Sequence, residues 1–242
     1  MNDTVPPSRA AILLVQLGTP DKPEVPEVRR YLREFLSDRR VVEQSPLIWW
    51  PILYSVVLTR RPKESAEKYR SIWTKAGSPL LVNTKLVAEA LQDELNKRGR
   101  QVEVVWAMRY GNPSMVDALR DLRDRGFSRI VVLPMYPQYS AATSGTVFDV
   151  IAREFLQWRS IPALRFLQSF HDDPGYIAAV AESIRHFWRQ SEAGKPEKLI
   201  FSFHGLPQSC VDQGDPYVKQ CQESAALIAG ALGLAKEDWL VT

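Results

Sequence analysis

The sequence has few cysteines, no block of like charge and no long uninterrupted apolar run. Cys210 and Cys221 are the only cysteines in 242 residues, too few for a disulfide framework and too far apart for a Cys-x-x-Cys site. We therefore expect a reducing compartment, and we interpret both thiols as small half-buried apolar side chains rather than metal ligands. No run reaches the roughly 20 apolar residues that a membrane-spanning helix needs, and no secretory signal is visible at the start.

The charges of the two signs are nearly balanced. Lysine and arginine number 31 against 28 aspartates and glutamates, a net charge of +3, so nucleic acid is not an expected partner. No Gly-x-Gly-x-x-Gly or Walker-type loop is present to bind a nucleotide. With 45% hydrophobic and 24% charged residues, the composition is that of a globular protein long enough for one large or two modest domains.

Short apolar runs alternate with helical patterns along the chain. The predicted strands are residues 11–15, 102–107, 129–133, 163–167 and 199–201, and residues 239–242 begin another. The predicted helices are residues 28–36, 80–98, 114–125, 147–158 and 174–190. Strands separated by helices pair in parallel through right-handed crossovers, so we predict an α/β fold whose parallel sheet is covered by helices on both faces.

One segment, residues 46–58, fits neither pattern. It is too apolar for a solvated loop and too short, and too interrupted by Pro51, for a membrane span. It contains Trp49 and Trp50, and two arginines follow it directly. Three interpretations stay open: a buried helix or loop packed on the core, the wall of a large apolar ligand site, or a lip that dips into a membrane surface.

His204 is the leading candidate for a functional residue. It follows the apolar run 199–201 and precedes Gly205, which places it at the carboxyl end of a predicted strand. Ligands of open parallel sheets bind beyond the strand carboxyl ends. An imidazole satisfied by the backbone of a turn is the equally good alternative.

Two loops are predicted at the same edge of the sheet. Residues 133–146 carry many hydroxyls and lead into a helix, where they could bind an anionic group; simple capping by Ser144 or Thr146 is the alternative. Arg109 follows another strand and suits a carboxylate, although a surface arginine bonded to a nearby aspartate is the simpler interpretation. His171 and the aspartates after it are interpreted as capping a helix, and His186 as a surface residue.

Taken together, several motifs resemble those of ferrochelatases, in the same order and over nearly the whole chain. They are Leu13-Leu14-Val15-Gln16-Leu17-Gly18-Thr19-Pro20, Tyr69 with Gly77-Ser78-Pro79-Leu80, Arg109-Tyr110-Gly111-Asn112-Pro113, Leu133-Pro134-Met135-Tyr136-Pro137-Gln138-Tyr139-Ser140, and Phe201-Ser202-Phe203-His204-Gly205-Leu206-Pro207 with Gly214-Asp215-Pro216-Tyr217.

The resemblance implies a fold and a reaction. It implies two similar doubly wound, Rossmann-like domains, with a cleft between them in which ferrous iron is inserted into protoporphyrin IX to form protohaem. It further implies that His204 is the iron ligand and proton acceptor, because imidazole is both a base near neutral pH and a ligand for iron. The residues that fall where the family lines its porphyrin slot are Leu17, Tyr69, Ser78, Arg109, Tyr139, Ser140 and Thr143.

The same resemblance gives expectations about domains and surroundings. We expect an N-terminal domain over residues 1–174, with 46–58 as the lip of the porphyrin cleft, and a partial C-terminal domain over 175–242. From its composition, the segment 194–197 is the best candidate for a linker between two units of alternating strands and helices. Iron is expected as a substrate, with no cofactor and no iron–sulfur cluster. We expect a cytoplasmic location, and a peripheral contact at the inner face of the membrane through 46–58 stays open.

The chain departs from the family at its end, because ferrochelatases continue further and carry there the carboxylate that faces the histidine. We therefore expect an incomplete second domain with partly exposed apolar side chains at Leu199, Phe201, Leu227 and Ile228. Two other functions remain: a truncated protein that binds porphyrin without metallating it, or a chelatase of another tetrapyrrole such as sirohydrochlorin, which the apolar lip disfavours.

Overall fold

The computed structural model describes residues 9–192 and 194–242, so the expectation about a secretory signal falls on residues outside the described part. The chain divides into two compact units. Unit 1 comprises the residues up to 135 and 141–168, and unit 2 comprises 136–140 and 169–242. The expected boundary between 174 and 175 differs from this division, because the segment 136–140 and the residues just after 168 make their contacts within unit 2.

Unit 1 is built on a parallel four-stranded sheet with the order β2-β1-β3-β4. Its strands are β1 (Ala10–Thr19), β2 (Val102–Gly111), β3 (Arg129–Pro134) and β4 (Ala163–Phe166). Its helices are α1 (Val25–Leu36), α2 (Pro46–Ile52), α3 (Leu58–Ile72), α4 (Pro79–Lys97), α5 (Met115–Asp124) and α6 (Thr146–Phe155), with π-helical turns η1 (Leu53–Val57) and η2 (Ala141–Gly145). The predicted parallel sheet is confirmed in this unit.

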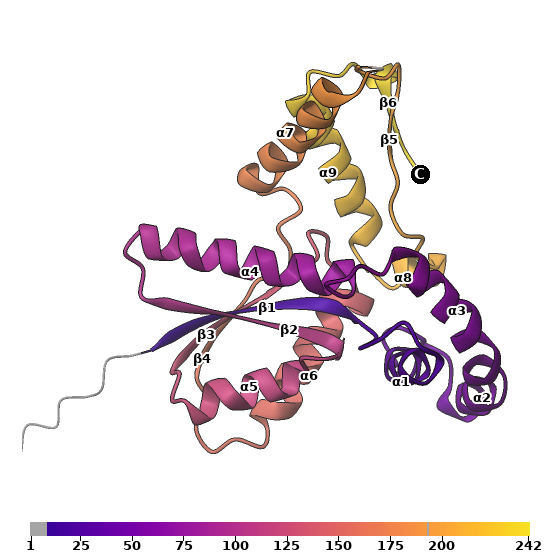
Figure 1. The fold of residues 1–242 in the computed structure, drawn as a ribbon, viewed down its shortest axis with the longest axis vertical. Helices are drawn as coiled ribbons and strands as arrows, with labels where there is room; N and C mark the ends of the chain where they lie inside the picture. Colours follow the sequence, from indigo (N-terminus) through magenta and orange to yellow (C-terminus); the bar gives the residue numbers. More distant parts are fainter. Residues whose placement is uncertain (1–8, 193) are drawn as a thin grey trace, which may run out of the picture. The chain divides into compact units, whose positions relative to one another are not determined.

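Figure 1 shows α4 on one face of this sheet and α5 and α6 on the other. The central strand β1 is therefore buried on both sides: Leu13, Leu14 and Val15 are at most 1% exposed. On α5 the apolar side chains recur at helical spacing, and Leu119 and Leu122 are fully buried. These two covered faces explain why the strands of unit 1 are continuous apolar runs.

The segment 46–58 is helical, and only one side of it is buried. Leu53 and Leu58 form a cluster with Leu36, and Trp49 packs against it. The indole N–H of Trp49 donates a hydrogen bond to the carbonyl of Leu36 (2.7 Å). Trp50, by contrast, is 55% exposed, so the interpretation as a buried helix holds for the Trp49 side of the segment alone.

The predicted loop before α6 contains the π-helical turn η2, which runs directly into α6. The alternative in which Ser144 or Thr146 caps α6 is not found: Gly145 holds the N-cap position in helical conformation and no side chain caps it. Ser144 is fully buried, and the hydroxyl of Thr146 donates to the carbonyl of Thr143 (2.9 Å).

Unit 2 has a smaller sheet, in which β5 (Leu199–Phe201) and β6 (Trp239–Val241) pair in parallel. Its helices are α7 (Pro174–Gln190), α8 (Gln208–Asp212), α9 (Tyr217–Ala231) and the short 3₁₀ turn η3 (Lys236–Asp238). Figure 1 shows α7 and α9 side by side. This unit contains only these two strands within the described residues.

The side chains of unit 2 that were expected to be partly exposed are mostly so. Leu199 and Phe201 are half-buried and Leu227 is 41% exposed. The expectation is wrong for Ile228, which is 3% exposed. Ile228 shares one helical face of α9 with the buried Cys221 and Ala225, so it belongs to the core of the unit.

Candidate functional site

Unit 1 places three of the predicted porphyrin contacts at the edge of its sheet that is formed by the carboxyl ends of the strands. Leu17 lies near the carboxyl end of β1 and Arg109 near that of the neighbouring β2. Ser78, at the N-cap of α4, is brought to the same edge because the hydroxyl of Thr19 donates to its Oγ (2.9 Å). The edge is the one where parallel α/β sheets bind ligands.

A close approach of the two strands explains the glycine after Leu17. Gly18 has φ of +117°, and a Cβ there would lie 1.8 Å from the carbonyl oxygen of Tyr110. No side chain fits in that space. The glycine of the Leu17-Gly18-Thr19 motif is therefore required by the structure. Only glycine lets β1 and β2 stay side by side up to their carboxyl ends.

The simpler interpretation of Arg109 is confirmed in its bond to an aspartate and wrong in its surface location. Its side chain is 9% exposed and forms an ion pair with Asp38, whose side chain is 11% exposed. Its Nε also donates to the carbonyl of Thr146 (3.0 Å), and its guanidinium lies 4.3 Å from the ring centroid of Tyr110. The guanidinium therefore holds three parts of unit 1 together: the loop after α1, the end of β2 and the start of α6.

The loop after α1 has a second anchor of the same kind. The phenol of Tyr110 donates to Asp38 (2.9 Å), and burial, the largest cause, raises the pKa of that phenol. Arg40 forms a two-pronged pair with Asp149 on α6 (2.5 and 2.8 Å). Because the segment 46–58 follows this loop directly, the two ion pairs fix the start of that segment against the sheet and α6.

The two remaining predicted contacts of unit 1 lie on helical elements. Tyr69, on α3, is half-buried and packs edge-on against the rings of Tyr31 and Trp73. Burial raises its pKa. Thr143 lies in η2, where its carbonyl accepts the hydrogen bond from Thr146.

Unit 2 holds Tyr139 and Ser140 against the first turns of α9. The backbone N–H of Tyr139 donates to Oε1 of Gln220 (2.7 Å), and the hydroxyl of Ser140 donates to Oδ2 of Asp215 (2.9 Å). The other oxygen of Asp215 accepts the backbone N–H of Tyr217 (3.0 Å). One carboxylate thus ties the segment 136–140 to the start of α9.

His204 lies three residues beyond the end of β5, and its side chain is exposed. Its Nδ1 is 2.7 Å from the carbonyl oxygen of Gly205. Because a carbonyl only accepts hydrogen bonds, Nδ1 carries the proton of the neutral ring, and Nε2 keeps its lone pair. This tautomer presents Nε2 as a base or a metal ligand.

Tyr217, the first residue of α9, lies near the backbone of His204 and the thiol of Cys221. The first lowers and the second raises the pKa of its phenol, and both effects are smaller than that of burial. Burial, the largest cause, raises the pKa of Tyr217 to about 12, and burial also raises the pKa of the Cys221 thiol. Asp215 and Tyr217, two residues apart, therefore support Ser140 and His204 from the same end of α9.

The other histidines have structural surroundings. His171 is 9% exposed, and its Nε2 lies 3.2 Å from a carboxylate oxygen of Glu223. Asp173 caps α7, because its side chain accepts hydrogen bonds from the backbone N–H groups of Gly175 and Tyr176. This confirms the capping interpretation of the cluster. His186 is exposed on α7. Within the described residues no three histidine, cysteine or acidic side chains are grouped to hold a metal ion.

Sequence reasoning missed the residues that support these predicted contacts. Asp38 carries no motif of its own, and it lies 71 residues from Arg109 in the chain. Asp215 and Tyr217 stood within the Gly214-Asp215-Pro216-Tyr217 motif, but no role was derived for them. That motif was the only available signal.

The two units define an α/β protein with parallel sheets, in which an exposed histidine follows a strand of one unit and hydroxyl-bearing residues gather at the sheet edge of the other. A family model described as Ferrochelatase matches residues 9–242. The chain belongs to the ferrochelatase family, whose members are lyases that insert iron into a porphyrin in haem synthesis.

Curated relatives agree with this assignment. The chain is 53% identical over 235 residues to a protein named Ferrochelatase from Methylococcus capsulatus, covering 97% of this chain and 70% of that protein. It is 49% identical to Ferrochelatase from Aromatoleum aromaticum, covering 98% of this chain and 64% of that protein. It is 47% identical to Ferrochelatase 2 from Shewanella oneidensis, covering 97% of this chain and 71% of that protein. The chain thus spans about two thirds of the length of these relatives.

Proposed function

We propose that the protein to which this chain belongs inserts ferrous iron into protoporphyrin IX, with His204 as the group that accepts pyrrole protons and contacts the iron. The observation that carries the proposal is the 2.7 Å distance between Nδ1 of His204 and the carbonyl oxygen of Gly205. Because the carbonyl can only accept, Nδ1 is the donor and the lone pair lies on Nε2 of an exposed side chain. The family gives the reaction class, and this geometry supplies a residue that can perform it.

The reaction needs such a group. Two protons leave the pyrrole nitrogens as the divalent ion enters, so a neutral base must stand beside the macrocycle. Nε2 can accept a proton while the carbonyl of Gly205 stabilises the imidazolium through Nδ1–H. Because the ring is exposed, solvent can then take the proton away, and the base is restored for the second transfer.

We assign substrate binding mainly to residues that are already held in place. The proposed contacts to the porphyrin come from both units. They are Leu17, Tyr69, Ser78 and Thr143 of unit 1, and Tyr139 and Ser140 of unit 2. Arg109 is assigned a different role from the one expected, because its side chain is 9% exposed and already binds Asp38 and the Thr146 carbonyl. It acts as a positioning residue for the loop that leads into 46–58.

Iron enters this proposal as a substrate, and no resident cofactor is assigned. Cys221 is 3% exposed, and burial raises the pKa of its thiol, so the thiolate form that an iron–sulfur cluster requires is disfavoured. Protoporphyrin and ferrous iron are the proposed partners, and nucleic acid is not.

We also propose a peripheral membrane contact through the segment 46–58. Leu47 is 88% exposed, Ile48 59% and Trp50 55%, a cluster of apolar side chains that a solvated surface disfavours. Arg60 and Arg61, both exposed, follow the segment. No helix in the described ranges is long and apolar enough to cross a membrane, so the contact would be made at the membrane surface.

The test of the catalytic role compares two histidines in a protein of the relatives' full length. His204→Ala should lower ferrous insertion by about 100- to 10,000-fold while porphyrin fluorescence is still quenched on binding, because a general base contributes that much to the rate. His186→Ala is the matched control, since His186 is also exposed but lies on α7. Retained turnover in His204→Ala would show that the active site lies elsewhere.

A further inference from the structure

The face of α1 that points to solvent carries two unpaired arginines. Arg29 and Arg33 are one helical turn apart and exposed, and neither forms an ion pair with any residue that the structure describes. Arg30, between them in sequence, is paired with Asp21 at 2.5 Å. Like charges one turn apart repel each other and weaken a helix, and Arg33 gains a favourable interaction with the helix dipole from its place in the last turn of α1.

Both arginines line a groove between α1 and the turn from η1 into α3. The groove has a volume of about 270 Å³, and Arg30 and Tyr54 also line it. Its wall is completed by apolar atoms of Pro26 and Leu58. Guanidinium groups present paired N–H donors that match the oxygens of a phosphate or carboxylate, and the phenol of Tyr54 adds another polar group.

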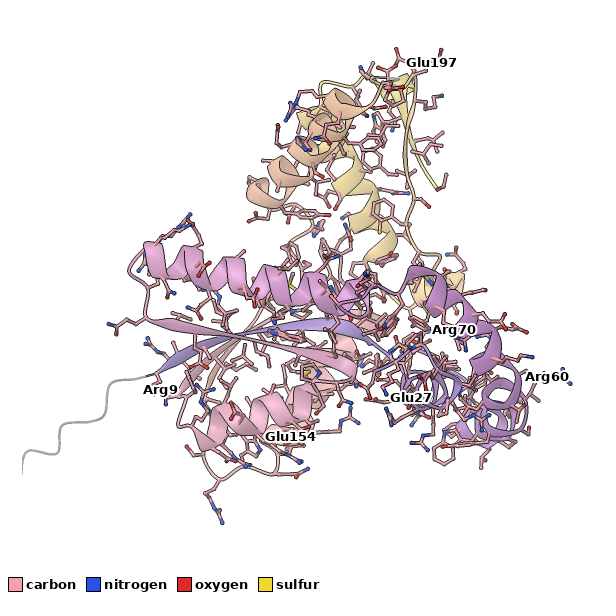
Figure 2. The ribbon with its side chains drawn as sticks, viewed as in Figure 1. Arg9, Glu27, Arg60, Arg70, Glu154 and Glu197 are labelled. Carbon is pink, nitrogen blue, oxygen red and sulfur yellow. The ribbon has the colours of Figure 1, made fainter. Side chains whose placement is uncertain are left out.

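The groove adjoins the exposed apolar side chains of the segment 46–58. Tyr54, which is 55% exposed, belongs to both, and Leu47 and Trp50 precede it by seven and four residues on the same helical side. Figure 2 labels Arg60 on the helix that continues from this segment, with its side chain pointing outward from the ribbon. A cationic groove therefore stands directly beside an apolar surface.

We propose that this groove binds the anionic headgroup of a phospholipid while the neighbouring apolar side chains enter the membrane surface. A small free anion would account for the arginines but not for the exposed leucine and tryptophan next to them. A lipid accounts for both, because its phosphate lies at the level of the headgroups and its acyl chains begin just below. The inference rests on the proposed membrane contact and adds to it a preference for anionic lipid.

The experiment measures sedimentation of the 242-residue chain with two kinds of vesicle, one of phosphatidylcholine alone and one that also contains phosphatidylglycerol. The chain should bind the anionic vesicles more tightly. The double variant R29Q/R33Q should lose about 25-fold in affinity for them, since a basic residue near an anionic surface is worth about 5-fold. Its binding to phosphatidylcholine vesicles should stay unchanged.

A matched control separates the groove from net charge. Arg159 and Arg165 are both exposed. Arg165 lies on β4, the outermost strand on the side of the sheet away from β2, and α1 packs against β2. R159Q/R165Q changes the net charge by the same amount and should keep its affinity within about 2-fold. Circular dichroism melts of both double variants check that each is folded.

Three results would overturn the inference. Equal binding of the unmodified chain to both vesicles would remove the headgroup preference and leave the membrane contact standing. Equal losses in the two double variants would assign the effect to net charge alone. Failure to bind either vesicle would remove the membrane contact as well. A variant with Leu47→Ser and Trp50→Ser should weaken binding to both vesicles, which measures the apolar contribution separately.

Discussion

Unit 1 and unit 2 are both built from parallel strands and helices, but they bury their strands to very different degrees. Ile130 on β3 of unit 1 is 1% exposed, whereas Ile200 on β5 of unit 2 is 59% exposed. β1 has a hydrogen-bonded neighbour on each side, and among the residues that the structure describes β5 pairs with β6 alone. Helices cover both faces of a stable parallel sheet, and within the described residues the strands of unit 1 have this cover to a much greater degree than β5 does.

The ion pairs differ in the same way. In unit 1 Arg109 and Asp38 pair with about a tenth of each side chain exposed. In unit 2 Glu182 pairs with Arg189 and Arg185, and all three side chains are largely exposed. The Arg109–Asp38 pair of unit 1 is thus shielded from solvent, whereas the Glu182 pairs of unit 2 lie where water and salt screen them.

The sharpest test of the comparison removes one acid from each unit. Asp38→Ala leaves the guanidinium of Arg109 buried without its counter-charge and should destabilise unit 1 by about 3–5 kcal/mol. Glu182→Ala removes an exposed acid and should cost about 0–1 kcal/mol. Hydrogen exchange of β1 and of α7 amides would report each unit separately. Equal losses would show that burial does not distinguish the two pairs.

The second test uses the same substitution on two strands. Ile130→Ala should cost about 2–5 kcal/mol, because it leaves a cavity in a packed core. Ile200→Ala should cost about 1 kcal/mol or less, since the side chain is already in contact with water. Urea unfolding followed by exchange of the strand amides measures both. A large loss for Ile200→Ala would mean that β5 is covered in solution.

The smallest expected effect concerns pH and belongs to unit 2. The folded-state pKa of Tyr217 is raised to about 12, against about 10 for an ordinary tyrosine. The folded state therefore holds the phenol proton more tightly, and this contribution to stability is complete below about pH 10 and is lost as pH rises to about 12. Tyr217→Phe should flatten the decline of unit 2 stability over that range, measured by unfolding midpoints. An unchanged slope would contradict the burial of this phenol.

Local periodicity accounts for the part of the fold that the sequence predicted. The helix predicted over residues 174–190 has the same bounds as α7, and the strands were found within a few residues, because each depends on neighbours along the chain. The family resemblance, confirmed by the comparisons, added the reaction class, which periodicity could not give. The role of His204 as the base stays a prediction.

The rest depended on contacts between distant residues. The partner of Arg109 lies 71 residues away and that of Ser140 lies 75 residues away, so neither follows from a local pattern. The alternative in which Ser144 or Thr146 caps α6 is not found, because the π-helical turn η2 runs directly into α6 and Gly145 holds the N-cap position. A π-helical turn has no simple sequence signal.

The assignment of residues 136–140 to unit 2 has a consequence for modularity. The polypeptide enters unit 2 after Met135, returns to unit 1 at Ala141 and leaves it again after Gln168. A fragment beginning at Ser169 would lack the segment 136–140, whose Gln138 donates to Ser224 (2.9 Å), and would leave that hydroxyl on α9 without this donor. Recombination with a single crossover therefore cannot exchange one unit intact, and the two must be inherited together.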